Sequence, residues 1–161
     1  MPVSLAGFFG ATTPDDHFQD LTEEYLSFFK LPTRRGLGNL LFRLVHLRES
    51  IAGKGWEAIQ DKKKRGEVLT AGEVFFEEMG WVSGFSDLRA LVNRLKHWEP
   101  KTGDPEATHV RGAPIGLIRT GDLLDQHFFL VDGKDIRTHL RSVYMAYKTW
   151  FSRNAYYRER N

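Results

Sequence analysis

Acidic side chains and a lysine gather at the end of one apolar stretch of the sequence. Residues 128–134 are FFLVDGK, so an apolar strand ends at Asp132 and Lys134, and Asp122 and Asp125 lie upstream. In nucleases of the restriction-enzyme type such carboxylates hold Mg²⁺, and the lysine positions the attacking water. Asp-Gly is also the commonest signal for a tight turn, and we prefer that interpretation. A Mg²⁺-dependent nuclease is therefore the third of three functional hypotheses.

No other side chains have the spacing of a catalytic or metal site. Cysteine is absent, which excludes disulfides and thiolate metal sites. The sequence has no Gly-x-x-x-x-Gly-Lys phosphate loop and no Gly-x-Ser-x-Gly nucleophile elbow. The histidines are scattered singly, without the i, i+4 spacing of a zinc site. They are His17, His46, His97, His109, His127 and His139. We therefore predict a protein that is not an enzyme and that uses no cofactor and no metal.

Two clusters of basic residues could bind the phosphate backbone of a nucleic acid. The first is a run of four cations, Lys62, Lys63, Lys64 and Arg65. A short run of this kind is usually a solvated surface loop, and we prefer that interpretation. The second lies along one stripe of the C-terminal segment and consists of Arg137, Arg141 and Lys148. The opposite stripe of that segment is aromatic, and it is expected to pack on the core or on a second subunit.

Apolar periodicity predicts the elements that position these residues. The predicted helices are 21–30 (capped by Asp20), 37–53, a short piece from Trp56, 70–80, a helix capped by Ser83 or Ser86, and a long one from Ile136. Between the last two helices, strands are predicted at 108–111, 114–120 and 126–131. In the turn after the helix 70–80, Gly80 is expected to take a positive φ, and the side chain of Trp81 is expected to be buried in the turn.

The order helix, helix, turn, helix, hairpin over about 37–131 resembles the winged helix-turn-helix superfamily of transcription regulators and plasmid replication initiators. The resemblance implies that the second helix of the motif enters the major groove of DNA. Arg89, Asn93 and Arg94 would then contact bases and phosphates, because Arg suits guanine and Asn suits adenine. Ser83 and Ser86 would reach phosphate from the helix start. The hairpin would offer Arg111 and Arg119 to the backbone or minor groove.

The first helix of the motif favours a different partner. Glu73, Glu77 and Glu78 are expected on its outward side, while Val74, Phe75 and Met79 face inward. Three carboxylates facing a polyanion would lower its affinity. A winged helix that serves as a protein-interaction module, without nucleic-acid contacts of its own, is therefore the second hypothesis.

The length of 161 residues fits one mainly α, α+β domain built around a winged helix. Its expected parts are an acidic N-terminal arm and short helix (1–36), a winged-helix-like core (37–135) and a basic amphipathic helix and tail (136–161). Leu5, Phe8 and Phe9 of the arm are expected to dock. The sequence shows no signal peptide and no apolar run that could span a bilayer, so a cytoplasmic protein without membrane contact is expected.

The leading hypothesis is non-catalytic binding of DNA or RNA, as a regulator, a replication initiator or a subunit of a nucleoprotein complex. A protein partner, or a homodimer formed through the C-terminal helix, is the alternative kind of partner.

Overall fold

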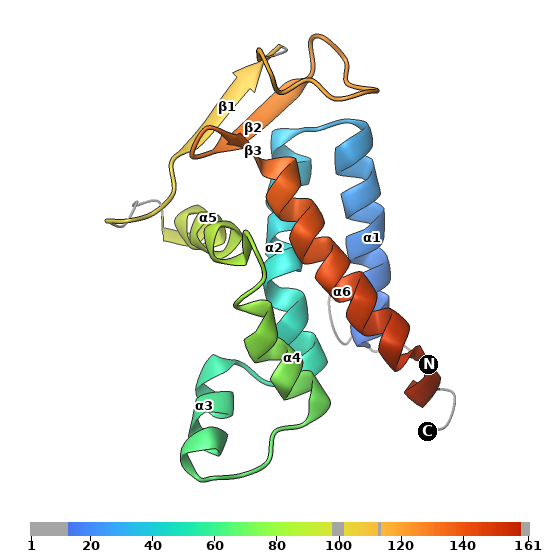
Figure 1. Cartoon of the computed structure of the whole chain (residues 1–161), viewed down its shortest axis with the longest axis vertical. Helices are drawn as coiled ribbons and strands as arrows, with labels where there is room; N and C mark the ends of the chain where they lie inside the picture. Colours follow the sequence, from blue (N-terminus) through green and yellow to red (C-terminus); the bar gives the residue numbers. More distant parts are fainter. Residues whose placement is uncertain (1–12, 98–101, 113, 159–161) are drawn as a thin grey trace, which may run out of the picture.

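The computed structural model describes residues 13–97, 102–112 and 114–158, and it is mainly helical with one small sheet (Figure 1). The elements are α1 (Pro14–Lys30), α2 (Arg34–Ala52), α3 (Trp56–Lys64), α4 (Ala71–Met79), α5 (Phe85–His97), β1 (Ala107–Arg111), β2 (His127–Val131), β3 (Lys134–Asp135) and α6 (Ile136–Arg158). The strands form one antiparallel sheet in the order β1-β2-β3. The predicted class, α+β and mainly α, is confirmed.

Helix α1 begins earlier than the sequence predicted. Thr13 caps it, because its Oγ1 accepts the N–H of Asp16 at 3.2 Å and Asp16 Oδ2 accepts the N–H of Thr13 at 3.0 Å. Pro14 suits the first helical position, where no N–H is needed. The capping role predicted for Asp20 is therefore wrong. The arm residues expected to dock, Leu5, Phe8 and Phe9, lie outside the described residues.

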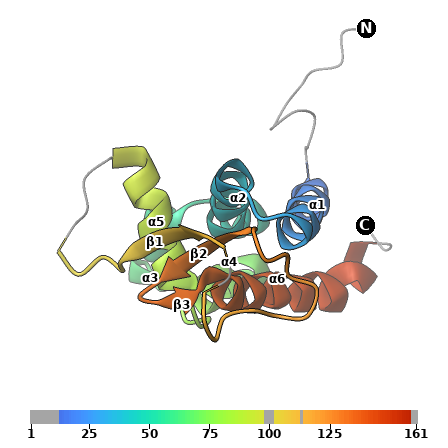
Figure 2. The same ribbon diagram turned by 90° about the horizontal axis from the view of Figure 1, so that it is seen from above.

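Helix α2 is the central helix, and α1, α4, α5 and α6 all contact it (Figures 1 and 2). Its apolar side is buried, as the periodicity predicted. The aromatic side of α6 packs on this core and not on a second subunit, since Tyr144, Tyr147 and Phe151 are buried. The hydroxyl of Tyr147 donates to Leu44 O at 2.7 Å and accepts the N–H of Arg48 at 3.1 Å. The apolar side on which a homodimer through this helix would depend is thus used within the chain.

The turn between α4 and α5 is built on a buried arginine. Arg48 of α2 donates from Nη1 to Phe76 O at 3.2 Å, and its guanidinium carbon lies 4.0 Å and 4.5 Å from the ring centres of Phe76 and Phe85. A cation at a helix C-terminus satisfies a carbonyl that has no partner within the helix. Arg48 therefore ties α2 to the end of α4 and to the start of α5.

Two predictions about this turn are wrong. Trp81 does not plug the corner, because its side chain is 90% exposed. Gly80 has a φ of −60°, and Gly84 has the positive φ of 85°. A Cβ at Gly84 would lie 2.4 Å from the ring of His139, so close packing against α6 also requires glycine there.

The sheet lies over the start of α2 and beside α5 (Figures 1 and 2). His109 of β1 faces Phe129 of β2, and Val131 faces Lys134 across a two-residue turn. That turn is Asp132-Gly133, with φ values of 49° and 74°, so the predicted hairpin corner is confirmed. The strand predicted at 114–120 is absent among its described residues, which form turns and irregular chain.

Candidate nucleic-acid interface

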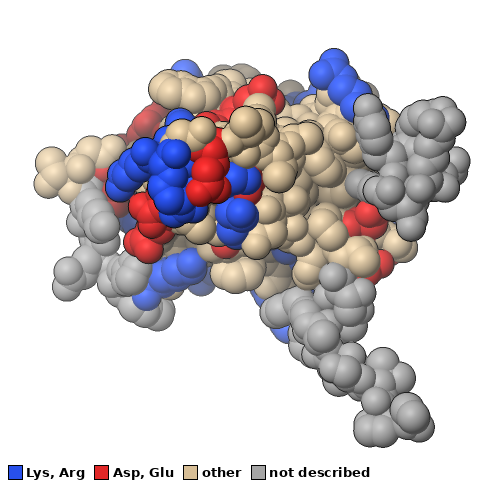
Figure 3. All heavy atoms as spheres, turned by 90° about the horizontal axis from the view of Figure 1, so that it is seen from below, with Lys and Arg blue, Asp and Glu red and all other residues tan. Residues whose placement is uncertain are grey.

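The four-cation run 62–65 belongs mostly to helix α3 and is engaged in ion pairs. Lys54 Nζ and Lys62 Nζ lie 2.6 Å and 2.7 Å from the carboxylate of Glu73, which has no exposed surface. Lys63 lies 2.8 Å from Glu77. The neighbouring pairs are Lys64 with Asp61 and Arg65 with Glu67. Figure 3, which views the end of the molecule where α3 lies, shows basic and acidic side chains intermingled.

Glu73 was predicted on the outward side of α4, and this is wrong. Thr70 caps α4, and Glu73 accepts the N–H of Thr70 at 2.8 Å, which turns its side chain toward α3 and the two lysines. Hydrogen bonds from Lys54 and Lys62 lower the pKa of Glu73 to about 2. Glu77 is half-buried, and only Glu78 of the three glutamates is exposed as predicted. Val74, which was expected inward, is 41% exposed.

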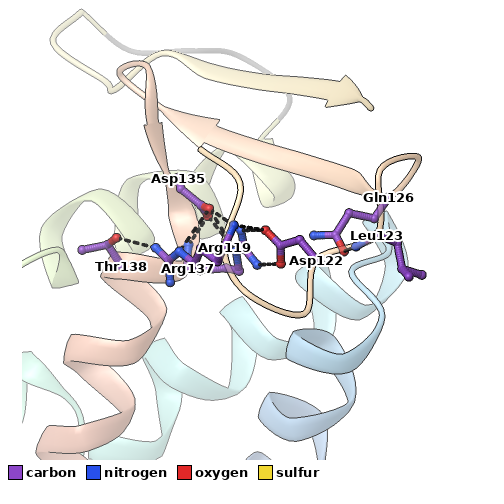
Figure 4. Close-up of polar contacts among 7 residues, drawn as sticks. All are labelled: Arg119, Asp122, Leu123, Gln126, Asp135, Arg137 and Thr138. Carbon is purple, nitrogen blue, oxygen red and sulfur yellow. Dashed lines mark hydrogen bonds and ion pairs between the residues drawn. The ribbon is translucent and has the colours of Figure 1, made fainter. Parts of the chain in front are cut away.

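Arg137 was predicted on an exposed basic stripe, but it is buried in a network of carboxylates (Figure 4). Its guanidinium donates to both oxygens of Asp122 at 2.6 Å and 2.9 Å, and to Asp135 Oδ2 at 2.7 Å. The reason is local: β3 runs directly into α6, so the first turn of α6 faces the loop that carries Asp122. Arg119 of this loop donates to Thr138 Oγ1 at 3.0 Å. Arg137 is therefore neutralised within the fold, whereas Arg119 is half-buried and donates to a neutral hydroxyl.

Two of the carboxylates that suggested a nuclease, Asp122 and Asp132, have partners within the fold. The hydrogen bond from Arg137 lowers the pKa of Asp122 to about 2. Asp132 lies in the hairpin turn and accepts the N–H of Glu106 at 2.8 Å. Among the described residues, no three histidines or carboxylates are grouped so that they could hold a metal ion. The residue types were suitable for Mg²⁺, but the fold uses Asp122 to hold a loop.

Helix α5 keeps its predicted outward residues at the surface. Arg89 and Asn93 are exposed, and neither side chain has a hydrogen-bond or ion-pair partner among the described residues. Arg94 is half-buried at the edge toward β1, and it donates to Pro105 O at 3.2 Å, which holds the chain entering β1 against α5. Ser86 lies in the first turn of α5 and Ser83 just before it, both exposed. Leu95, near the C-terminal end of α5, is 60% exposed.

A groove of about 380 Å³ separates α5 from β1, with the start of α2 as its third wall. We call it the α5–β1 groove. Its apolar lining includes Leu37, Leu41, Leu91, Phe129 and Ile136. Its polar lining is cationic or neutral, with Arg34, Arg94 and His109, and no carboxylate is found among the described lining residues. The start of α2 carries no acidic residue in its first turn, so Arg34 and Arg35 are not balanced there. This groove combines positive charge with an apolar floor.

A pair of histidines borders the groove on the sheet. His109 Nε2 lies 2.6 Å from His127 Nδ1, so one ring donates and the other accepts. The ring of His109 is stacked on Phe129, with centres 4.7 Å apart and planes within 8°. Burial, together with His127 and Arg34, lowers the pKa of His109. The imidazole is therefore mostly neutral at pH 7.

The structure brings together some of the predicted residues and not others. Arg94 lines the groove and Arg111 is exposed at the end of β1, whereas Arg89 and Asn93 are exposed on α5 but do not line the groove. Arg141 and Lys148 are exposed on α6 but do not line the groove. Sequence analysis missed Arg34 and His109. The signal available was two arginines in the first turn of a helix that lacks acidic residues there, opposite to the usual charge preference.

In comparisons with known proteins, no family model, no curated protein and no solved structure matches this chain. Within the described part of the chain, no helix has the length and apolar character needed to cross a membrane.

Proposed function

We propose that the protein binds nucleic acid, without catalysis, through the α5–β1 groove and the exposed side of α5. One observation carries the proposal: the described lining of the groove holds Arg34, Arg94 and His109 and no carboxylate. A polyanion is bound by cations that acids do not already neutralise. The cations of α3 and Arg137 are already paired with carboxylates. Arg141 and Lys148 of α6 are exposed as well, but in the described part of the chain they line no groove with an apolar floor, so the α5–β1 groove is favoured.

In the finer version of this proposal, α4, α5 and the β1–β2 hairpin form a winged helix-turn-helix. Helix α5 is then the recognition helix, with Arg89 and Asn93 available to base edges and Arg111 to the backbone. The acidic side predicted for α4 was the main electrostatic argument against this role. It is reduced, because Glu73 is buried and Glu77 is paired with Lys63. A regulator, a replication initiator or a nucleoprotein subunit fits such a surface.

The test is fluorescence anisotropy with labelled single-stranded and duplex DNA and RNA between about 50 and 200 mM salt. Arg34→Ala combined with Arg111→Ala removes two cations that have no ion-pair partner among the described residues. We expect the slope of log K against log salt to fall by about 1.4 for a single strand or 1.8 for a duplex.

The matched control is Lys63→Ala combined with Lys64→Ala, which makes the same change of charge on α3. This variant should leave the slope unchanged, because Lys63 is neutralised by Glu77 and α3 lies away from the groove. Equal effects of the two double variants would contradict the assignment to the groove. Absence of binding at the lowest salt would contradict the function itself.

A second candidate function, a protein-interaction module, is favoured by the loop between β1 and β2. Four apolar side chains in this loop are more than half exposed: Ile115, Ile118, Leu123 and Leu124. The loop is held by the pairing of Asp122 with buried Arg137, so these side chains are presented on an anchored segment. This candidate predicts no retention on nucleic acid, and a partner in pull-down that is lost when Ile115 and Leu124 are changed to serine.

A further inference from the structure

The floor of the α5–β1 groove is apolar, which restricts what nucleic acid could place there. Leu37, Leu41 and Leu91 line it from the helices, and Phe129 lines it from the sheet. A volume of about 380 Å³ lies in the range of pockets that enclose a small organic group. Phosphate and sugar would gain nothing from such a floor, because polar groups lose hydration there without finding partners. A nucleobase has two apolar faces and would fit.

His109 offers a flat ring at the edge of this floor. One side of the ring is covered by Phe129, and its edge is fixed by the contact with His127 at 2.6 Å. The residue is nevertheless exposed, and it belongs to the lining of the groove. A flat ring held in this way, and mostly neutral at pH 7, is a suitable stacking surface, because histidine is among the side chains on which unpaired bases stack. It would lose little conformational freedom on binding.

We propose that the α5–β1 groove takes an unpaired base of single-stranded nucleic acid, stacked on His109, while Arg34 and Arg94 contact the flanking phosphates. The inference rests on the proposed function and names its ligand class. In a duplex, both faces of each base are already stacked on neighbouring bases, so the ring of His109 has no face to contact. An apolar base stacked within a rim of arginines is how proteins bind single strands with little sequence preference.

The test uses three labelled probes: an oligothymidine, a duplex of that oligothymidine with oligoadenosine, and an abasic oligomer with the same number of phosphates. Fluorescence anisotropy at one low salt concentration is expected to give the tightest binding for oligothymidine. His109→Ala should weaken the binding of oligothymidine about tenfold and leave the binding of the abasic oligomer unchanged. His109→Tyr, which keeps a flat ring, should restore the affinity for oligothymidine.

The matched control is His17→Ala, a half-buried histidine on α1 that does not line the groove. It should bind all three probes as the unaltered protein does, and melting curves should show that every variant is folded. If His109→Ala melts early, His109→Tyr still decides the matter, because a stacking role predicts that its affinity is retained.

The failures of the two proposals are distinguishable. If the abasic oligomer or the duplex binds as tightly as oligothymidine, or if neither His109 variant changes the affinity in the expected way, the inference of a stacked base is overturned. The wider function would still stand, provided that the Arg34→Ala and Arg111→Ala double variant weakens binding. If no probe binds, both proposals fail.

Discussion

The α3–α4 end of the molecule and the α5–β1 groove are both rich in cations, but they differ in what surrounds those cations. At the α3–α4 end, Lys54 and Lys62 contact a carboxylate that is fully buried, and Lys63 contacts Glu77. In the groove, Arg34 has no ion-pair partner among the described residues, and no described lining residue is acidic. The first arrangement joins two helices. The second leaves positive charge available to a ligand.

A stretch of sequence that is dense in lysine and arginine is therefore not necessarily a surface with unneutralised positive charge. The run 62–65 is the most basic stretch of the chain, yet every one of its members has an acidic partner. Arg137 is not only paired with carboxylates but also buried, between Asp122 and Asp135. The groove has fewer cations, but they remain unneutralised. Three predictions, ordered by the size of the expected effect, test whether paired cations are structural and open ones are functional.

Arg137→Met should have the largest effect, because it leaves the carboxylates of Asp122 and Asp135 buried without their cation. We expect the free energy of unfolding to fall by about 3–5 kcal/mol, measured by urea denaturation. Arg111→Met, the matched control at the exposed end of β1, should change it by less than about 0.5 kcal/mol. Similar losses in the two variants would remove the distinction between paired and open cations.

Acidification should have the second largest effect, because it protonates the carboxylates of these ion pairs and lowers the free energy of unfolding. The pKa values of Glu73 and Asp122 are about 2 in the folded protein, against ordinary values of 4.5 and 3.8. The unfolded chain therefore binds more protons in this window, so stability is present above the ordinary values and is lost as the pH falls from about 4.5 toward 2. The urea midpoint should decline over that window, and the decline should be shallower in Glu73→Gln. A midpoint that does not change there would contradict the role of both pairs.

The smallest effect on binding is expected when the lysines of α3 are freed from their carboxylates. Glu73→Gln combined with Glu77→Gln removes the partners of Lys54, Lys62 and Lys63. The variant should bind duplex DNA more tightly, with a salt slope steeper by about 0.9 for each lysine that reaches a phosphate. The control is Glu78→Gln, which removes an exposed carboxylate without freeing a lysine. Anisotropy titrations that fail to separate the two variants would show that pairing does not limit these lysines.

Much of the fold could be predicted because local patterns specify it. The apolar period of α2 gave its buried side, the Asp132-Gly133 turn followed from its own chemistry, and the start of α6 was placed at Ile136. Boundaries were less certain where two local signals competed. Thr13 and Asp16 cap α1, although Asp20 and Glu23 have the same spacing further along. The candidate site was predicted only in part, since Arg94 was expected there but Arg34 and His109 were not.

The sequence by itself determined most of the helices, the tight turn and the absence of thiol chemistry, because these depend on neighbouring residues or on composition. Only the tertiary structure decided which charged side chains are neutralised by ion pairs within the chain. Lys62 meets Glu73 from another helix, and Arg137 meets Asp122 from a loop. The groove depends on still more distant contacts, since Arg34 and His109 come from elements far apart in the chain. Ion pairs form or fail according to distances of a few ångströms, and for residues far apart in the chain the packing of the elements sets those distances.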